Sequence, residues 1–432
     1  MKNRKALALI AILALVAAAC GGSDGGSDEA VVEVETTEAP ATTEAPTTTA
    51  APAPASDPLI LASLMPLSGD LASLGPGIAL GAALAVEQIN AAGGINGQPV
   101  QLIEGDSGCD GAVALTSLND VIAQGAQGVM GAACSSTSLA ILDTAIAAEV
   151  VMVSPSNTSP QFTKIDKKGF YARTAPSDLL QGDVLASLLV EDGVQTVSII
   201  SRADSYGRGL AEATAAAFEA AGGTVKTIVY HATDASEVTS EVTAVGKGGA
   251  DAIVGILFPE TGCGVLQPAF EQGLLDTPWY MTDGVKDAGL ASLCGLGTAL
   301  DGFKGTAPGS AAGEAKDAFE AAYAEVSADG SPTFIFAPQA YDAVMLMAIS
   351  AAANGVTGPE IASGLVAASS GGEKCIGVAC IALAADGVDV DYVGASGEIE
   401  LNAVGDPTAA TYDIWTTEGD TNPVLKSVDF GS

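Results

Sequence analysis

The chain of 432 residues is poor in histidine, aromatic residues and positive charge. It holds one His and 5% aromatic residues, and its 16 Lys and Arg stand against 52 Asp and Glu, a formal net charge of −36. One His excludes a multi-His metal site and leaves little for His-dependent catalysis. The shortage of basic residues argues against binding to nucleic acid and against charge-driven binding to anionic membranes. We interpret the charge as a solvated acidic surface, with attraction of cationic ligands as the alternative.

Sequence motifs of common enzymes are also missing. The chain has no CxxC, no metal-ligand cluster and no GxSxG elbow after a predicted strand. Gly75, Gly77 and Gly81 form GxGxxxG, which departs from the dinucleotide-binding fingerprint, so we assign Gly77 and Gly81 to close helix packing or ligand approach. His231 has no nucleophile motif beside it, and we expect it to be a surface histidine after a strand. We therefore predict that the protein is not an enzyme and has no metal and no cofactor.

The N-terminus has the features of an export signal. Lys2, Arg4 and Lys5 precede an apolar run over 6–19, which is too short for a confident membrane span. The run ends in small residues followed by Cys20, as in a bacterial lipobox, with Ala17 where Leu is more common. We predict a lipoprotein signal peptide over 1–20 and lipidation of Cys20, which would hold the protein on the outer face of the cell membrane, in the periplasm or at the cell surface. Plain secretion is the alternative.

Residues 21–57 have the composition of a linker. They carry eight acids and no base, and they consist mainly of Gly, Ser, Asp, Thr-Thr-Glu-Ala-Pro repeats and Ala-Pro. Such a segment cannot bury a core, so we predict a disordered tether.

From residue 58 the sequence alternates between short β-like runs and Ala-rich helical stretches. Strands are expected at 59–65, 99–104, 128–132, 150–153, 196–201, 224–230, 251–257, 278–282, 397–401 and 411–416. Helices are expected at 76–92, 112–124, 137–148, 180–192, 207–221, 236–248, 262–273, 311–328 and 337–354. This alternation indicates βαβ units and parallel sheets. About 375 residues are long for one sheet, so we predict an α/β fold of two doubly wound lobes with a ligand cleft between them.

Six cysteines remain after Cys20, an even number in an exported chain, which predicts three disulfides. Cys375 and Cys380 can close a small local loop. Cys109 and Cys134 each follow a predicted strand, and Cys263 and Cys294 remain. Sequence alone does not decide the pairing.

Several short stretches occur in an order that resembles the type I periplasmic binding proteins, specifically the branched-chain amino-acid receptors of ABC importers. They are Pro66-Leu67-Ser68-Gly69, Leu74-Gly75, Ile89–Gly97, Asp106–Asp110, Gly131–Thr137, Val153–Pro160, Tyr206-Gly207 and Thr282-Asp283-Gly284. The resemblance covers essentially all of 58–432.

The resemblance implies two lobes joined by a hinge of three crossovers near 174–178, 304–309 and 403–408. It places 58–176 and 306–404 in the first lobe and 177–305 and 405–432 in the second. It also implies a Cys109–Cys134 bridge.

The same resemblance assigns a ligand site, and the chemistry of an α-amino acid fits it. The carboxylate of such a ligand needs hydroxyls and free N–H groups at a helix N-terminus, which Ser135 and Ser136 would supply. Capping by Ser135 is compatible with this role. Thr158 would add another hydroxyl beside Asn157, and Ser156 would offer its carbonyl; for Thr158 the alternative is a loop residue.

The ammonium group of the ligand needs an acid, and Asp283 stands where well-studied members of the family have Glu. An Asp-Gly turn is the alternative role for Asp283. Tyr206 would close over the ligand and Phe258 would line the pocket, with core packing as the alternative for both. Ser73 and Leu74 would line the side-chain pocket, where the family often has an aromatic residue. Asp106 is expected to be structural.

The resemblance thus implies an extracytoplasmic, monomeric receptor that delivers an amino acid, branched-chain or similar, to ABC permease subunits. An amide, a urea-like compound or a small carboxylate is the alternative ligand. A sensory binding protein is the alternative role, and a secreted enzyme is less favoured.

Overall fold

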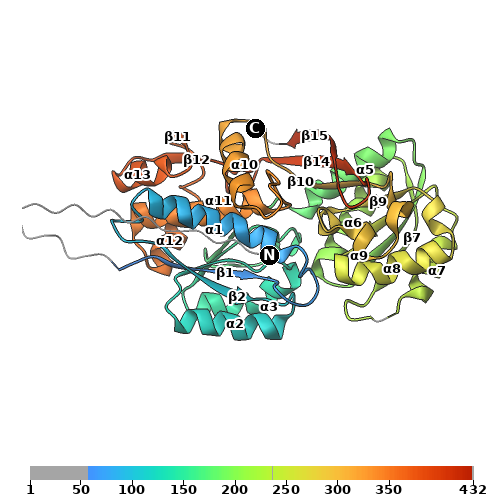
Figure 1. Cartoon of the computed structure of the whole chain (residues 1–432), viewed down its shortest axis with the longest axis horizontal. Helices are drawn as coiled ribbons and strands as arrows, with labels where there is room; N and C mark the ends of the chain where they lie inside the picture. The colour runs from blue at the N-terminus through green and yellow to red at the C-terminus, as the bar shows by residue number, and fades with distance from the viewer. Residues whose placement is uncertain (1–56, 236, 431–432) are drawn as a thin grey trace, which may run out of the picture. The chain divides into compact units, whose positions relative to one another are not determined.

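The computed structural model describes residues 57–235 and 237–430. The predicted signal peptide, Cys20 and the tether up to residue 56 lie outside these residues. The described residues belong to one compact unit, 54–432. This unit contains two lobes, each with its own sheet (Figure 1). The predicted α/β class with two parallel-sheet lobes is confirmed.

The first lobe is built on a parallel sheet with the strand order β2-β1-β3-β4-β5. Its strands are β1 (Ile60–Met65), β2 (Gln101–Asp106), β3 (Gly128–Gly131), β4 (Val151–Ser154) and β5 (Tyr171–Arg173). The lobe also holds a small third sheet, with strands β11 (Glu373–Ile376), β12 (Val390–Gly394) and β13 (Gly397–Glu398). Strands β3 and β4 are buried throughout, as expected for parallel strands that are covered on both faces.

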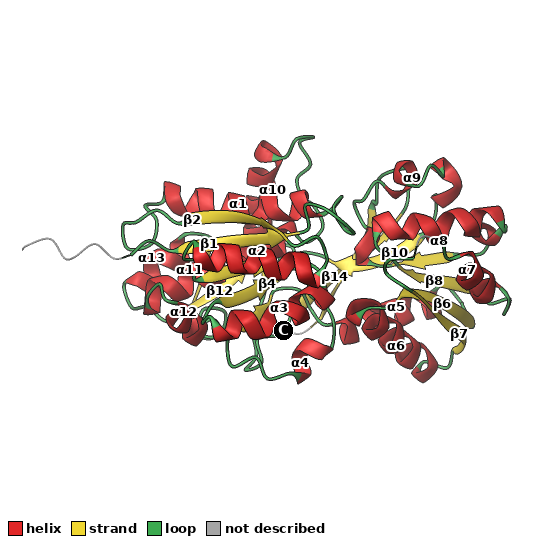
Figure 2. Cartoon of the chain, turned by 90° about the horizontal axis from the view of Figure 1, so that it is seen from below, coloured by secondary structure: helices red, strands yellow, loops and turns green. Residues whose placement is uncertain are grey.

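Helices cover both faces of the first sheet, with α1 and α11 on one side and α2 and α3 on the other (Figures 1 and 2). The helices of this lobe are α1 (Gly75–Ala91), α2 (Gly111–Ala123), α3 (Ser135–Ala147), α4 (Gln161–Lys164), α10 (Glu314–Val326), α11 (Ala337–Asn354), α12 (Gly358–Gly364) and α13 (Ala379–Ala385). The bounds of α11 are those predicted. This helix is buried on almost every side, which explains why its own apolar residues occupy all of its faces and not one stripe.

The second lobe has a sheet in the order β15-β14-β10-β9-β8-β6-β7, in which β14 runs antiparallel to β10 and to β15. Its strands are β6 (Thr196–Arg202), β7 (Thr224–His231), β8 (Ala252–Ile256), β9 (Trp279–Met281), β10 (Lys304–Pro308), β14 (Ala410–Thr416) and β15 (Val424–Phe430). Its helices are α5 (Asp178–Glu191), α6 (Ser205–Ala220), α7 (Thr239–Gly246), α8 (Pro259–Glu271) and α9 (Leu290–Leu293), with 3₁₀ turns at Leu274–Asp276, Asp283–Val285 and Gly297–Leu300.

The chain passes between the lobes three times: after β5, after β10, and between β13 and β14. Residues 304–308 form β10 of the second sheet, so the second passage follows Pro308 and the predicted boundary at 306 falls inside this strand. The strand predicted over 397–401 ends at Glu398 because Glu400 adopts a positive φ of 43°.

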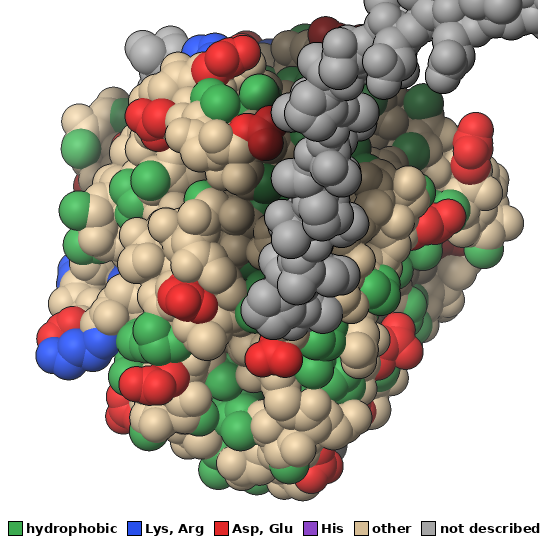
Figure 3. Space-filling model, turned by 90° about the vertical axis from the view of Figure 1, so that its left-hand side faces the viewer, with side chains coloured by type: hydrophobic (Ala, Val, Ile, Leu, Met, Phe, Trp, Pro, Cys, Tyr) green, Lys and Arg blue, Asp and Glu red, His purple; other side chains and the backbone are tan. Residues whose placement is uncertain are grey.

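Some surface and metal properties follow directly from the described residues. None of their helices is long and apolar enough to cross a membrane, and no group of three or more His, Cys, Asp or Glu among them could hold a metal ion. Acidic side chains are scattered over the face shown in Figure 3 and do not gather in one patch.

The expectation that His231 is a surface histidine is wrong. This residue is only 1% exposed, and burial lowers the pKa of its imidazole.

Candidate functional site in the cleft between the lobes

The two lobes share one strand order, which locates a site in each. The order β2-β1-β3-β4-β5 recurs as β7-β6-β8-β9-β10. The strand order reverses between β1 and β3 in the first sheet and between β6 and β8 in the second. Ligands of open α/β sheets bind at the carboxyl ends of the strands at such a reversal. The predicted site residues come from the loops after β1, β3 and β4 in the first lobe and after β6, β8 and β9 in the second.

These loops enclose a cavity to which both lobes contribute. It is lined by Leu71, Leu74, Ile78, Ala133, Ser135, Ser156, Tyr206, Phe258, Asp283, Gly284 and Phe336. Its volume of about 20 Å³ has room for a water molecule but not for an amino acid. The described arrangement is therefore a closed one, and an amino-acid ligand requires the lobes to separate.

Six of the nine predicted ligand residues line this cavity: Leu74, Ser135, Ser156, Tyr206, Phe258 and Asp283. Ser136, Asn157 and Thr158 do not. The lining also includes Leu71, Ile78, Ala133, Gly284 and Phe336, which the sequence reasoning missed. Leu71 and Phe336 both adopt a left-handed backbone, with φ of 73° and 61°, a strain that is often found at ligand sites.

Ser135 opens helix α3 at the wall formed by the first lobe. The residue before it, Cys134, makes no side-chain cap hydrogen bond, so the first N–H groups of α3 are not capped in that way. The Ser135 Oγ accepts a hydrogen bond from the Ser159 N–H at 3.3 Å. A helix N-terminus with free N–H groups and a hydroxyl is suited to a carboxylate.

Asn157 organises the loop after β4 and is not among the residues that line the cavity. Its Nδ2 donates to the carbonyl oxygens of Ala132 (3.0 Å) and Ala133 (2.8 Å), and its Oδ1 accepts from the Tyr171 hydroxyl (2.9 Å). The loops after β3 and β4 are thus held together by a side chain that we predicted to contact ligand.

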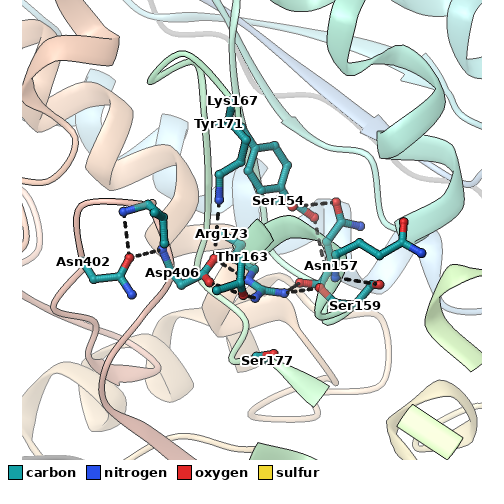
Figure 4. A network of polar contacts seen from close by, with 12 residues as sticks. Ser154, Asn157, Ser159, Thr163, Lys167, Tyr171, Arg173, Ser177, Asn402 and Asp406 are labelled. Atoms are coloured by element: carbon teal, nitrogen blue, oxygen red, sulfur yellow. Dashed lines mark hydrogen bonds and ion pairs between the residues drawn. The ribbon is translucent and has the colours of Figure 1, made fainter. Parts of the chain in front are cut away.

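The buried cation Arg173 fixes the same loop through hydrogen bonds that are drawn in Figure 4. Arg173 Nη1 donates to the carbonyl oxygens of Asn157 (3.1 Å) and Ser159 (3.0 Å), and its Nε donates to Asp406 (2.9 Å). Burial alone would raise the pKa of Asp406, but the Arg173 charge and its hydrogen bonds lower it overall. Arg173 ends β5, just before the first passage between the lobes, and Asp406 lies in the third passage, so this network connects the loop after β4 with the hinge.

Asp283 provides the charge on the opposite wall. Its Oδ1 accepts from Gln181 Nε2 at 2.7 Å and from the Tyr206 hydroxyl at 3.0 Å. Burial raises the pKa of Asp283 to about 6, although these two hydrogen bonds act in the other direction. A cation that entered the cavity would favour the charged carboxylate and lower this pKa again.

A second buried acid, Asp178, was missed by the sequence reasoning. Its side chain is fully buried, and among the described residues neither carboxylate oxygen has a hydrogen-bond partner. Burial, followed by the negative charge of Asp283, raises its pKa well above the usual range. Its backbone N–H donates to the carbonyl of Thr158 at 2.8 Å, which places Asp178 next to the loop after β4. An unpartnered buried acid needs a counter-charge or a proton.

Aromatic side chains form the rest of the wall in the second lobe. Tyr206 and Phe258 stack with ring centroids 5.3 Å apart, and the Arg202 guanidinium lies 3.8 Å above the Phe258 ring. Both rings line the cavity, so they contribute to the site as well as to packing.

The six described cysteines form three pairs. The structure joins Cys109 to Cys134, the pair that the resemblance implied, with Cα atoms 5.5 Å apart. It also joins Cys263 to Cys294 and Cys375 to Cys380. The first pair ties the loop after β2 to the residue that precedes α3.

Two α/β lobes thus close on a small cavity whose lining is mainly apolar, with Ser135, Ser156 and Asp283 as its polar side chains besides Tyr206. The model of the periplasmic binding protein family matches residues 58–374, and the chain belongs to this family. Its fold is that of the type I members, whose solved structures include a branched-chain amino acid transporter substrate binding protein of Streptococcus pneumoniae in complex with isoleucine. That structure is 22% identical, with a TM-score of 0.72, over 87% of this chain and 100% of the other.

Curated relatives carry related names. An amino acid binding protein of Pseudomonas aeruginosa is 34% identical over 53% of this chain and 62% of its own length. A leucine-, isoleucine-, valine-, threonine- and alanine-binding protein of the same species is 29% identical over 68% of this chain and 78% of its own length. The chain therefore spans less than two thirds of the first relative and more than three quarters of the second. These relatives are binding proteins, and the family is extracytoplasmic.

Proposed function

We propose that the chain is the substrate-binding component of an ABC importer and binds an α-amino acid between its lobes. The observation that carries this proposal is the charge layout of the cavity. The uncapped start of α3 and Ser135 lie on one wall, and the buried acid Asp283 lies on the other. A ligand that satisfies both walls carries an anionic and a cationic group close together.

Each group of the amino acid has a counterpart in this arrangement. The carboxylate would bind the first N–H groups of α3 and the Ser135 hydroxyl. The ammonium would lie by Asp283 and Tyr206. Asp178, whose raised pKa favours its protonated form, does not line the cavity and supplies no second charge to it. The ligand side chain would meet apolar residues, among them Leu71, Leu74 and Phe258. Ser156, Ser136 and Thr158 remain proposed contacts of the opened cleft.

Matched ligands test this proposal directly. L-leucine carries both charged groups, L-leucinamide lacks the carboxylate, and 4-methylpentanoate lacks the ammonium. We expect thermal stabilisation and calorimetric binding by L-leucine or a related amino acid, and much weaker effects from the two analogues. A ligand at 100 times its dissociation constant adds about 2.7 kcal/mol to the free energy of unfolding. Tight binding of the amide or of the carboxylate alone would contradict the proposal and identify one of the alternative ligands.

Delivery to a permease and attachment to the membrane are further parts of the proposal. Deletion of the protein should abolish high-affinity uptake of the amino acid by the cell; unchanged uptake with an altered response to the amino acid would indicate a sensory role. For the anchor, the wild-type protein should partition into detergent and Cys20→Ser should not. We propose that the body acts as a monomer, which sedimentation of the residues after the tether would test.

A further inference from the structure

A short segment of the first lobe, residues 70–74, is held by side chains of the second lobe. The Glu260 carboxylate accepts hydrogen bonds from the backbone N–H of Leu71 (2.7 Å) and of Ser73 (2.8 Å). These contacts cross the cleft beside the cavity, since Leu71 and Leu74 both line it. We call residues 70–74 the clasp segment.

The N–H groups of Leu71 and Ser73 have their hydrogen-bond acceptor in the second lobe, on Glu260. The clasp segment leads into α1, whose N-cap residue Leu74 makes no side-chain cap hydrogen bond. Glu260 stands in the first turn of α8, where a negative charge is also favourable for its own helix. The Glu260 carboxylate therefore joins the start of α8 to the turn before α1, and these hydrogen bonds form only when the lobes are closed.

The conformation of Leu71 supports this reading. Its φ of 73° lies in the left-handed region, which is unfavourable for a leucine. Such a conformation persists when the surroundings impose it, and the N–H of Leu71 itself donates a hydrogen bond to the Glu260 carboxylate. In this conformation the Leu71 side chain is 5% exposed and forms part of the cavity wall.

A second contact anchors the start of the clasp segment. Asp70 pairs with Arg202, which is 2% exposed and stacks on the pocket residue Phe258. Arg202 Nη1 also donates to the Thr261 hydroxyl at 3.1 Å. Groups from both α8 and the end of β6 thus fix the same segment of the first lobe.

We propose that Glu260 is a positioning residue that gives the site its selectivity for the ligand side chain. By holding the clasp segment, it places Leu71 and Leu74 against the side chain of the ligand in the closed state. A large apolar side chain gains from this wall, whereas a methyl side chain does not reach it. This inference rests on the proposed binding of an amino acid in the cleft.

Glu260→Gln tests the inference because it keeps the size of the side chain but offers one acceptor oxygen where the carboxylate offers two. We expect the affinity for L-leucine to fall about 10-fold and that for L-alanine about 3-fold or less, measured by calorimetry. Glu271→Gln is the matched control, since Glu271 is an exposed residue at the end of the same helix, and it should change neither affinity. An equal loss for both ligands, or no loss, would overturn the inference.

A double-mutant cycle with Leu71→Ala separates positioning from a general effect on folding. Leu71→Ala should itself lower the leucine-to-alanine affinity ratio, and Glu260→Gln should lower it no further in that background. Independent, additive losses would show that Glu260 does not act through Leu71.

Amide hydrogen exchange of residues 67–75 in the protein without ligand, whose described arrangement is the closed one, tests the clasp contact separately from the proposed function. We expect faster exchange in Glu260→Gln than in the wild type or in Glu271→Gln, whatever the ligand is. If the wild type bound no amino acid but exchange still rose, the proposed function would fall and the clasp contact would stand. Unchanged exchange would overturn the clasp contact itself.

Discussion

Asp283 concentrates the charge that the proposed ligand requires. It is 3% exposed and is held by Gln181 and Tyr206, which leave its negative charge without a cationic partner in the closed cavity. Asp283→Asn keeps the shape and removes the charge, so we expect L-leucine affinity to fall about 100-fold at pH 7. Calorimetry of this variant against Asp276→Asn, an exposed acid on the turn before β9, provides the measurement and its control. Retained affinity would show that the ammonium group binds elsewhere or is absent.

The raised pKa of Asp283 also predicts how stability depends on pH. A carboxyl group with a folded-state pKa of about 6, above its unfolded value, binds more protons in the native state between these two values. Its charged form therefore costs stability as the pH rises through 6. In the ligand-free protein, Asp283→Asn should gain thermal stability relative to the wild type between pH 5 and pH 7. A difference that stays constant over this range would contradict the pKa.

Asp178 illustrates what sequence reasoning cannot find at the scale of a residue. In the sequence it follows Pro-Ser and begins a helix, which is an ordinary place for an acid. Only the tertiary structure buries both of its oxygens, with the Thr158 hydroxyl as a nearby donor that lowers its pKa less than burial raises it. For Asn157 the sequence motif predicted a ligand contact, and it did not reveal that the side-chain amide donates hydrogen bonds to two carbonyls of the loop after β3.

At the scale of elements, the sequence predicted those with a strong period and missed those without one. Helix α11 was placed at its observed bounds because its apolar run is long and has a clear end at Asn354 and Gly355. Strand β5 has three residues and includes the buried Arg173, so no apolar pattern marks it. The strands β11 and β12 are short and lie among Gly, Ser and charged residues, where turn signals dominate.

The Arg173–Asp406 pair is an element-scale connection, and its loss should be costly. Asp406→Asn would leave Arg173 and the buried Lys167 without their counter-charge, and removal of one partner of a buried pair typically costs about 3–5 kcal/mol. We expect this loss in the free energy of unfolding by urea. Asp386→Asn, at the exposed end of α13, is the control and should stay within about 0.5 kcal/mol of wild type. A small effect of Asp406→Asn would mean that water replaces the ion pair.

The disulfides should differ in what they do for binding. Cys109–Cys134 fixes the residue before α3, whereas Cys375–Cys380 closes a small loop that lines none of the cavity. Replacement of Cys109 and Cys134 by Ala should lower both stability, by about 2–4 kcal/mol, and ligand affinity. The same replacement of Cys375 and Cys380 should leave affinity unchanged. Equal affinities of the two variants, measured well below their unfolding temperatures, would show that the first bridge does not position the site.

At the scale of the whole body, binding depends on the balance between open and closed lobes. The cavity of about 20 Å³ excludes an amino acid, so the ligand must enter an open state and then stabilise a closed one. Any contact that forms only on closure contributes to affinity through this balance, even without touching the ligand. The hydrogen bonds between Glu260 and the clasp segment are one such contact, and the packing of Gly209 against Pro160 is another.

Gly209 in α6 faces Pro160 of the first lobe so closely that an added Cβ would lie 2.7 Å from the proline Cδ. Gly209→Ala should therefore wedge the lobes apart, while alanine favours the helix itself by about 1 kcal/mol. We expect ligand affinity to fall about 10-fold through faster dissociation, with a larger radius of gyration in X-ray scattering and no loss of folding stability. Gly264→Ala in α8 is the control, because its added Cβ meets only Val238 at 3.9 Å. If Gly209→Ala bound ligand as tightly as Gly264→Ala, the closed arrangement of Pro160 and Gly209 would not be the one that retains the ligand.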